Sequence, residues 1–374
     1  MLPAGHYETP THSTYAPFMR VWLPLRAPAP PLGVYRESIR MGKKFRVIAS
    51  SDLASGVPSW FPTACLCPTR WIEIATASPH LGAAGPELVA DALRGVVLIA
   101  HGHSDGPLAL AHVAERLASV GFVVAAPSFS DSHSNDATSI AQFGSSFLPE
   151  HTALRVRAME DCHVSIRDTF GGLQGKPTAL IGYSIGTDTV RHMPMECPRL
   201  YVGGPGWVNK ISAERNIHVP PPPAGPSCQL LAAPDGLMDH YELSADKSSE
   251  LTGYACPEKR TKVTAEEFMQ RVLPLASASS DTQQGSSPPP LPVRHLRIDY
   301  EPFGHGDFKY PPFEAAETNA WRSGFCGVNP WDPMGAGPDP AVKQERAAES
   351  AEAIVRWLLA ATGTATVDDS GLAA

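Results

Sequence analysis

A serine flanked by glycines is the residue of this sequence best suited to act as a nucleophile. Residues 179–181 form an apolar run, and Gly-Tyr-Ser-Ile-Gly follows directly at 182–186. This spacing is typical of a sharp turn from a strand into a helix, where the glycines allow close backbone approach and the serine hydroxyl is exposed. Five-residue patterns also recur by chance, so the position of Ser184 after a predicted strand is what favours it.

A histidine between two glycines supplies the candidate base. Leu296, Ile298 and Tyr300 alternate as in a β-strand, and Gly-His-Gly follows at 304–306. A histidine on a loop just beyond a strand can return over the sheet edge and take the serine proton. Among the 14 histidines, only His305 lies downstream of Ser184, directly after a strand and between glycines. This placement favours catalysis over the alternative, a solvated loop histidine.

The acid that would orient His305 has two candidates. Residues 228–233 are mostly apolar and predict a strand, Asp235 follows it, and Asp239 comes four residues later. A carboxylate in this loop can accept the Nδ1–H of the histidine and fix its tautomer. We favour Asp235 and keep Asp239 as the alternative, while Asp235-Gly236 could also form a simple turn.

Two backbone N–H groups are candidates for an oxyanion hole. An apolar strand is predicted at 96–100, and His-Gly-His follows at 101–103. In a site of this kind, the loop after such a strand supplies one donor and the residue after the nucleophile supplies the other. We therefore expect the N–H groups of His103 and Ile185 to hold the oxyanion. The side chains of His101 and His103 are interpreted only as polar groups of a loop.

Apolar residues in the loops that should overhang the sheet edge are candidates for a substrate pocket. A large apolar leaving group requires a groove lined by such side chains. The candidates are Phe129, Phe143, Phe147, Trp207, Val208 and Leu237.

Strands and helices that could position these residues alternate along the chain. After the strand at 96–100, apolar residues recur with helical spacing between 108 and 120, a strand is predicted at 122–126, and a helix at 152–169. This alternation predicts an α/β fold with a mostly parallel central sheet and helices on both faces. A last helix is predicted at 345–361, with these residues facing the core: Ala348, Ala351, Ile354, Val355 and Leu358.

The predicted organisation has three parts. Residues 1–94 form an irregular lead-in packed on the core, with candidate edge strands at 19–23 and 45–48. Residues 95–361 form the catalytic domain, and 362–374 a flexible tail. Within the domain, residues 276–292 are rich in Ser, Gln and Pro, which predicts a disordered insertion.

Composition narrows the class of partner. A formal net charge of −8 argues against nucleic acid, because phosphate contacts need clustered Lys and Arg. No apolar run approaches the length of about 20 residues that a membrane helix needs. The seven cysteines are too few and too scattered for a disulfide framework, and Cys65 and Cys67 are too close for a usual zinc pair. We expect a small-molecule ester as partner and no metal or cofactor, and leave the oligomeric state open.

The amino-terminal residues bear on localisation. The segment lacks a basic stretch followed by a long apolar one, so a secretory signal is not expected. Residues 1–40 hold four Arg and two acidic residues, which keeps a plastid location open beside a cytoplasmic one.

Four of these segments together resemble a known group of enzymes. They are His101-Gly102 after a strand, residues 117–127, the turn at 182–186, and Gly-His-Gly-Asp-Phe at 304–308. The chain resembles the chlorophyllase, dienelactone hydrolase and platelet-activating-factor acetylhydrolase group of α/β-hydrolases, over residues 95–359. The last motif, Cys326 and the closing helix are most similar to chlorophyllases, which cleave the phytyl ester of chlorophyll. The resemblance implies an α/β-hydrolase fold and a serine esterase acting through an acyl-enzyme.

The chain also departs from the chlorophyllase pattern. Tyr183, Ile185 and Thr187 stand where chlorophyllases have His, Arg and the last Gly of their elbow. Chlorophyllases and the acetylhydrolases take their acid from the strand after the elbow, where this chain has Gly203-Gly204, so Asp235 better fits the dienelactone hydrolase position. A thioesterase, an acyltransferase and a non-catalytic binding protein of the same fold remain alternatives.

Overall fold

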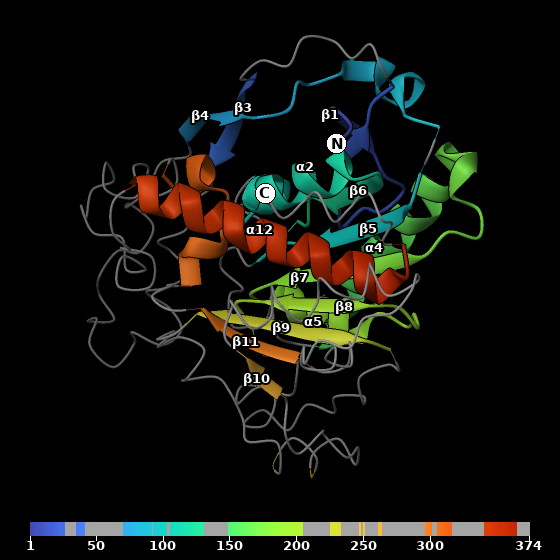
Figure 1. The fold of residues 1–374 in the computed structure, drawn as a ribbon. Coiled ribbons are helices and arrows are strands. Elements are labelled where there is room, and N and C mark those ends of the chain that lie inside the picture. The colour runs from blue at the N-terminus through green and yellow to red at the C-terminus, as the bar shows by residue number, and fades with distance from the viewer. Residues whose placement is uncertain are drawn as a thin grey trace, which may run out of the picture.

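A computed structural model of the chain describes residues 1–26, 35–41, 70–91, 93–102, 105–130, 149–204, 225–232, 247, 250, 261–263, 296–300, 305–315 and 340–364. Figure 1 shows these residues as a central sheet with helices packed against it.

The central sheet has nine strands in the described part of the chain. Their order is β1-β2-β6-β5-β7-β8-β9-β11-β10. The seven strands from β6 to β10 in this order run parallel to one another, while β2 is antiparallel to both β1 and β6. The strands are β1 Ala4–Pro10, β2 Phe18–Pro24, β5 Gly95–Ala100, β6 Phe122–Pro127, β7 Thr178–Tyr183, β8 Arg199–Val202, β9 Ser227–Ala232, β10 Thr261–Val263 and β11 Leu296–Tyr300.

The strand expected at 19–23 is present as β2, but it lies one position inside the sheet because β1 pairs along its outer side. The first 24 residues thus add two strands to the central sheet. A separate two-stranded antiparallel sheet joins β3 (Tyr35–Met41) to β4 (Arg70–Thr76). The strand expected at 45–48 and the insertion expected at 276–292 lie outside the described residues, as does most of the expected tail.

Helices follow the strands as the alternation predicted. They are α2 Ala111–Ser119, α4 Pro149–Thr169, α5 Gly186–His192 and α12 Pro340–Thr362, with short 3-10 turns η3 Gly82–Leu88, η4 Pro107–Leu110, η6 Gly171–Leu173 and η8 His305–Phe308. The helix expected at 108–120 is divided between η4 and α2, and the one expected at 152–169 begins at Pro149. None of the described helices combines the length and apolarity needed to span a bilayer.

Alternate residues of β5 face two separate cores. In β5, Val97 and Ile99 pack with α2 and α12, whereas Val96 and Leu98 pack with α4 on the other face. The two-residue period of a strand produces this division, because successive side chains point to opposite faces. Since both faces are covered, β5 to β7 consist almost entirely of buried residues, as parallel strands usually do.

The closing helix is present but longer than expected, and one residue expected to face the core does not. It begins at Pro340, five residues before the expected start. Ala351, Ile354, Val355 and Leu358 are buried as expected, but Ala348 is exposed. The prediction for Ala348 was wrong because the buried stripe continues through Ala347, which is four residues before Ala351 and so lies on the same helix face.

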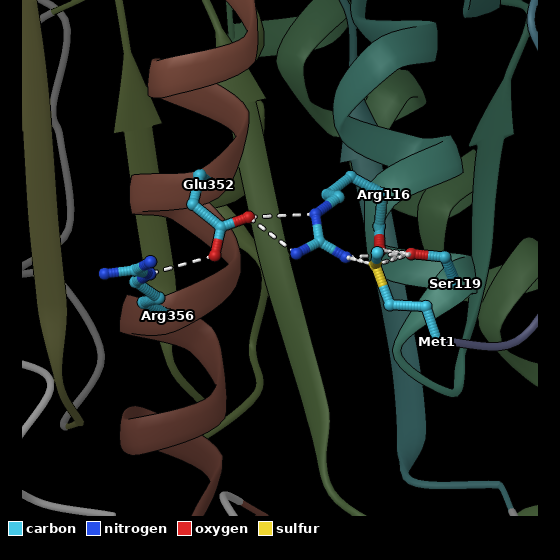
Figure 2. A network of polar contacts seen from close by, with 5 residues as sticks. All are labelled: Met1, Arg116, Ser119, Glu352 and Arg356. Atoms are coloured by element: carbon cyan, nitrogen blue, oxygen red, sulfur yellow. Dashed lines mark hydrogen bonds and ion pairs between the residues drawn. The ribbon is translucent and has the colours of Figure 1, made fainter. Parts of the chain in front are cut away.

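A network of hydrogen bonds and ion pairs connects α12 to α2 (Figure 2). Glu352 of α12 accepts from Arg116 of α2 at 2.7 and 2.9 Å, and from Arg356 at 2.9 Å. Arg116 also donates to the Ser119 hydroxyl at 3.1 Å and contacts the sulfur of Met1. About one fifth of the Arg116 and Glu352 side chains is exposed, so this pair is partly shielded from water.

Candidate active site

The strands of the parallel sheet end close together at one edge. Ala100 of β5 pairs with Gly182 of β7, and Val202 of β8 pairs with both Tyr183 and Leu230. Parallel strands have their carboxyl ends at the same edge, where ligands of such sheets bind. The turn after β7, the loop after β5 and the turn after β11 therefore approach one another.

Ser184 lies on a strained turn at this edge. Its φ angle of 53° is in the left-handed region, and no other non-glycine residue in the described segments has a positive φ. A left-handed conformation disfavours an L-residue, so the surroundings must hold it there. The Ser184 N–H donates to the Val202 carbonyl at 2.9 Å, and Thr187 donates to the Ser184 carbonyl from its N–H (3.0 Å) and its hydroxyl (2.7 Å).

The glycines of the turn leave no room for side chains. A Cβ atom at Gly186 would collide with the carbonyl oxygen of Ala100, and one at Gly182 with the carbonyl oxygen of Gly186. The helix α5 can therefore start close against β5 and β7, as a strand-to-helix turn with an exposed serine requires. The structure thus confirms the conformation expected of this turn.

His305 lies beside the same turn although 121 residues separate it from Ser184 in sequence. It begins η8, is 8% exposed, and its ring stacks on that of Tyr183 with centroids 5.4 Å apart at an interplanar angle of 28°. A Cβ atom placed on Gly203 would lie 3.4 Å from both Nδ1 and Cε1 of His305. The Nδ1 side of the imidazole therefore faces the end of β8.

A buried ion pair joins the loop after β5 to the turn that carries His305. Asp105, which is 2% exposed, is paired with Lys309 at 2.7 Å. The Asp105 carboxylate lies against Gly102, and a Cβ atom on Gly102 would lie 3.1 Å from the Cβ atom of Ser184. Two loops expected to serve the reaction are thus linked by a charge pair next to Ser184.

A second set of charges fixes the other end of this turn. Lys343 of α12 is paired with Glu314 at 3.1 Å and lies 3.5 Å from Asp307. Tyr310 donates its hydroxyl to the Ala75 carbonyl at 2.7 Å and its N–H to the Ala109 carbonyl at 2.7 Å. The segment after His305 is therefore held by α12, by η4 and by β4.

His101 is a buried structural residue, not a loop residue at the surface. It is 1% exposed, its Nε2 accepts from the Phe129 N–H at 3.3 Å, and its Nδ1 lies 2.8 Å from the Gly102 carbonyl oxygen. Phe129, an expected pocket residue, has no exposed surface and packs against the ring of His101 and under the guanidinium of Arg155. Arg155 donates to the His101 carbonyl at 3.0 Å, which braces the start of this loop from α4.

The free cysteines in the described part of the chain are not candidate nucleophiles. Cys162, Cys197 and Cys228 are all buried and free. Burial raises the pKa of Cys162 to about 12 and that of Cys197 to about 11, and also raises the pKa of Cys228. Because the thiolate is the reactive form, these cysteines are inert at neutral pH.

The structure brings Ser184, Ile185 and His305 together at one sheet edge. Ile185 immediately precedes α5, where N–H groups have no partner within the helix. The other candidates lie outside the described residues: Asp235, Asp239, His103, Phe143, Phe147, Trp207, Val208 and Leu237. Within the described ranges, no group of three or more His, Cys, Asp or Glu side chains could hold a metal ion.

Sequence reasoning missed Tyr183, Asp105 and Lys309. Tyr183 donates its hydroxyl to the His305 carbonyl at 2.9 Å, and the only signal in the sequence was its position directly before Ser184. Asp105 and Lys309 each lie four residues from a residue named above, His101 and His305, but nothing in the sequence pairs them across 204 positions.

The strand order, the antiparallel β2 and the strained serine turn after β7 define an α/β-hydrolase fold. This confirms the fold expected from the sequence motifs. No protein-family model matches the chain, and no curated protein sequence matches it either.

Three solved structures are among those similar to the chain. One is a ferulic acid esterase from Streptomyces cinnamoneus, at 12% identity, 96% coverage of this chain, 89% coverage of that chain and a TM-score of 0.47. Another is a dienelactone hydrolase from Anabaena variabilis, at 14% identity, 45% and 74% coverage and a TM-score of 0.28. A dienelactone hydrolase-like promiscuous phosphotriesterase from metagenomic libraries has 14% identity, 58% and 74% coverage and a TM-score of 0.28.

Proposed function

We propose that the chain is a serine carboxylic ester hydrolase. The observation that carries this proposal is the strained Ser184 on the turn after β7, with the buried imidazole of His305 beside the same turn. Ser184 is half-buried at the sheet edge, and a serine held at a positive φ on such a turn is the arrangement that acyl transfer by a serine requires.

In the proposed mechanism, His305 takes the proton of Ser184 as the serine attacks the ester carbonyl. The N–H groups of His103 and Ile185 hold the oxyanion, the alcohol leaves with a proton from His305, and water then releases the acid from the acyl-enzyme. The serine also argues against chemistry that needs a carboxylate nucleophile.

Asp235 is the proposed acid, with Asp239 as the alternative. The Nδ1 side of His305 faces Gly203 at the end of β8, and β9 is the next strand of the sheet. This neighbourhood supports Asp235, which comes three residues after the end of β9 in the sequence, as the residue that accepts the Nδ1–H. Gly203 has no side chain to do so, which supports an acid from the loop after β9.

Labelling by a fluorophosphonate probe tests the nucleophile. The wild-type protein should be labelled on Ser184, and Ser184→Ala should lose both labelling and ester hydrolysis while remaining folded. Ser165→Ala is the matched control and should be labelled like wild type. Ser165 lies in the second half of α4, whereas Arg155, which contacts the loop after β5, lies in the first half. A wild-type protein that is not labelled would favour a non-catalytic binding protein.

An ester panel tests the substrate class. We propose hydrolysis of simple alkyl and aryl esters, with chlorophyll as a further candidate. Its long apolar chain would need the remaining pocket candidates, since Phe129 has no exposed surface. Release of chlorophyllide at a rate matching that of a short aryl ester would establish a chlorophyllase. Transfer to an added alcohol in preference to water would indicate an acyltransferase, and faster turnover of thioesters would indicate a thioesterase.

A further inference from the structure

Tyr183 contacts His305 in two ways. Its hydroxyl donates to the His305 backbone carbonyl at 2.9 Å, and its ring stacks on the imidazole with centroids 5.4 Å apart. The hydrogen bond fixes where the histidine backbone lies, and the stacking restricts the plane of its ring. Both contacts are shielded from water, since Tyr183 has no exposed surface and His305 is 8% exposed.

The ring of Tyr183 is itself held between two glycines. A Cβ atom on Gly102, after β5, would lie 3.1 Å from Tyr183 Cδ1, and one on Gly203, after β8, would lie 3.1 Å from Tyr183 Cε2. These two carbon atoms are at opposite edges of the ring. The ring therefore fills a slot between the backbones that follow the two strands next to β7, and it cannot swing sideways.

Tyr183 is also the residue directly before Ser184, and it ends β7. The backbone of the serine and the backbone of the histidine are thus connected through one rigid side chain. We propose that Tyr183 is a positioning residue that sets the distance and ring orientation of His305 relative to Ser184. This inference rests on the proposed function and assigns no chemical step to the Tyr183 hydroxyl.

A positioning role predicts a loss in kcat more than a change in KM. Without the hydroxyl, the His305 turn loses its tie to the serine turn, so the imidazole reaches the serine proton in a smaller fraction of the bound complexes. Small displacements of a catalytic group can cost as much as about 100-fold in rate. Substrate binding does not use the hydroxyl, because it is buried and already bonded to His305.

Tyr183→Phe is the test, and Tyr310→Phe is its matched control. Tyr310 is also buried, also donates its hydroxyl to a backbone carbonyl, that of Ala75 at 2.7 Å, and also stacks on a histidine, His112, at 6.0 Å. Both variants lose one buried hydrogen bond and keep the ring. We expect Tyr183→Phe to lower kcat about 10-fold or more with KM little changed. Tyr310→Phe should keep the wild-type kcat, because the segment after His305 remains held by the Tyr310 N–H bond to Ala109 and by Lys343.

The imidazole signal of His305 in an NMR spectrum of histidine-labelled protein provides a readout that does not need activity. The signal is identified by its absence in His305→Ala. It should shift or broaden in Tyr183→Phe and stay in place in Tyr310→Phe. An unchanged signal in Tyr183→Phe, or equal kcat in the two variants, would overturn the positioning role.

The two proposals fail in different ways. If the wild-type protein neither hydrolyses esters nor reacts with the fluorophosphonate probe, the ester hydrolase proposal fails. The NMR comparison still decides whether Tyr183 holds His305 in place. If the wild type is active but the two phenylalanine variants behave alike, the hydrolase proposal stands and the role of Tyr183 is refuted.

Discussion

Ser184 combines the proposed nucleophilic hydroxyl with an unfavourable backbone conformation. Its φ of 53° costs an L-residue about 1–2 kcal/mol relative to a right-handed conformation. The bonds from Ser184 to Val202 and from Thr187 to Ser184 hold the turn in this state. The cost is offset by the packing of α5 against β5 and β7, which the two glycines of the turn permit.

This strain can be measured through stability. Ser184→Gly removes the Cβ atom that disfavours a positive φ, so it should be more stable than Ser184→Ala. The expected difference is about 1 kcal/mol, reduced in part by the greater chain entropy of glycine in the unfolded state. Urea unfolding of the two variants gives the difference, and both should lack esterase activity. Equal stability would mean that the turn is not strained at this residue.

The two candidate acids can be separated by single substitutions. If Asp235 orients His305, Asp235→Asn should lower kcat by up to about 10⁴, because the amide stabilises the wrong tautomer. Asp239→Asn should then have a mild effect and serves as the control. Initial rates with one aryl ester measure both. The opposite order of effects would transfer the role to Asp239.

At the scale of elements, the loops at the sheet edge are anchored by side chains from other parts of the fold. The His305 turn is tied to β7 through Tyr183, to the loop after β5 through Asp105 and Lys309, and to α12 through Lys343. The helix α12 is in turn tied to α2. Through these charge pairs, the closing helix α12 helps to hold the His305 turn at the sheet edge.

The pair between Arg116 and Glu352 should contribute measurably to stability. A double-mutant cycle with Arg116→Gln and Glu352→Gln should give a coupling free energy of about 1 kcal/mol, at the upper end for such pairs. Both side chains are mostly buried, and Arg356 also binds the Glu352 carboxylate and holds it in place. Urea unfolding provides the values.

The matched control for this cycle is the pair between Arg26 and Asp91. Its 2.8 Å contact is equally short, but the two side chains are 56% and 86% exposed. Solvent screens such a pair, so the same cycle there should give a coupling close to zero. Equal coupling in both pairs would show that burial is not what strengthens the one between the helices.

At the scale of the whole molecule, one histidine with buried ring nitrogens should make the fold sensitive to acid. Both ring nitrogens of His112 are buried with no hydrogen-bond partner among the described residues, and burial lowers the pKa of His112 from 6.5 to about 3. The unfolded chain therefore binds a proton between pH 6.5 and about 3 that the folded chain does not, so stability falls as pH falls through this window.

His112→Phe should reduce this sensitivity. The phenyl ring keeps the stacking on Tyr310, while the slope of stability against pH should fall by up to about 1.4 kcal/mol per pH unit below 6.5. Urea midpoints between pH 7.5 and 5 provide the measurement, with exposed His12→Gln as control. The raised pKa of Glu115 acts in the opposite direction, since its folded form holds a proton that the unfolded form has lost. A slope unchanged in His112→Phe would contradict the assignment.

The sequence by itself determined where several strands and helices of the core lie and which residues stand at the strand ends. Periodicity is a local property, so the strands β5, β6, β7 and β11 and the helix α4 could be located from neighbouring residues alone. The glycines around Ser184 likewise encode their turn within five residues. For the same reason, the face of α12 was predicted correctly except at Ala348, where one alanine could not be distinguished from the next.

Only the tertiary structure decided which distant residues meet. The bond from Tyr183 to His305 and the pair of Asp105 with Lys309 join positions 122 and 204 residues apart, and the addition of β1 outside β2 depends on the whole sheet. Such contacts arise because parallel strands bring their ends to one edge whatever their separation in sequence. The burial of His101 and of both ring nitrogens of His112 follows from the same packing and could not be predicted, since neither residue differs from a surface histidine in its local sequence.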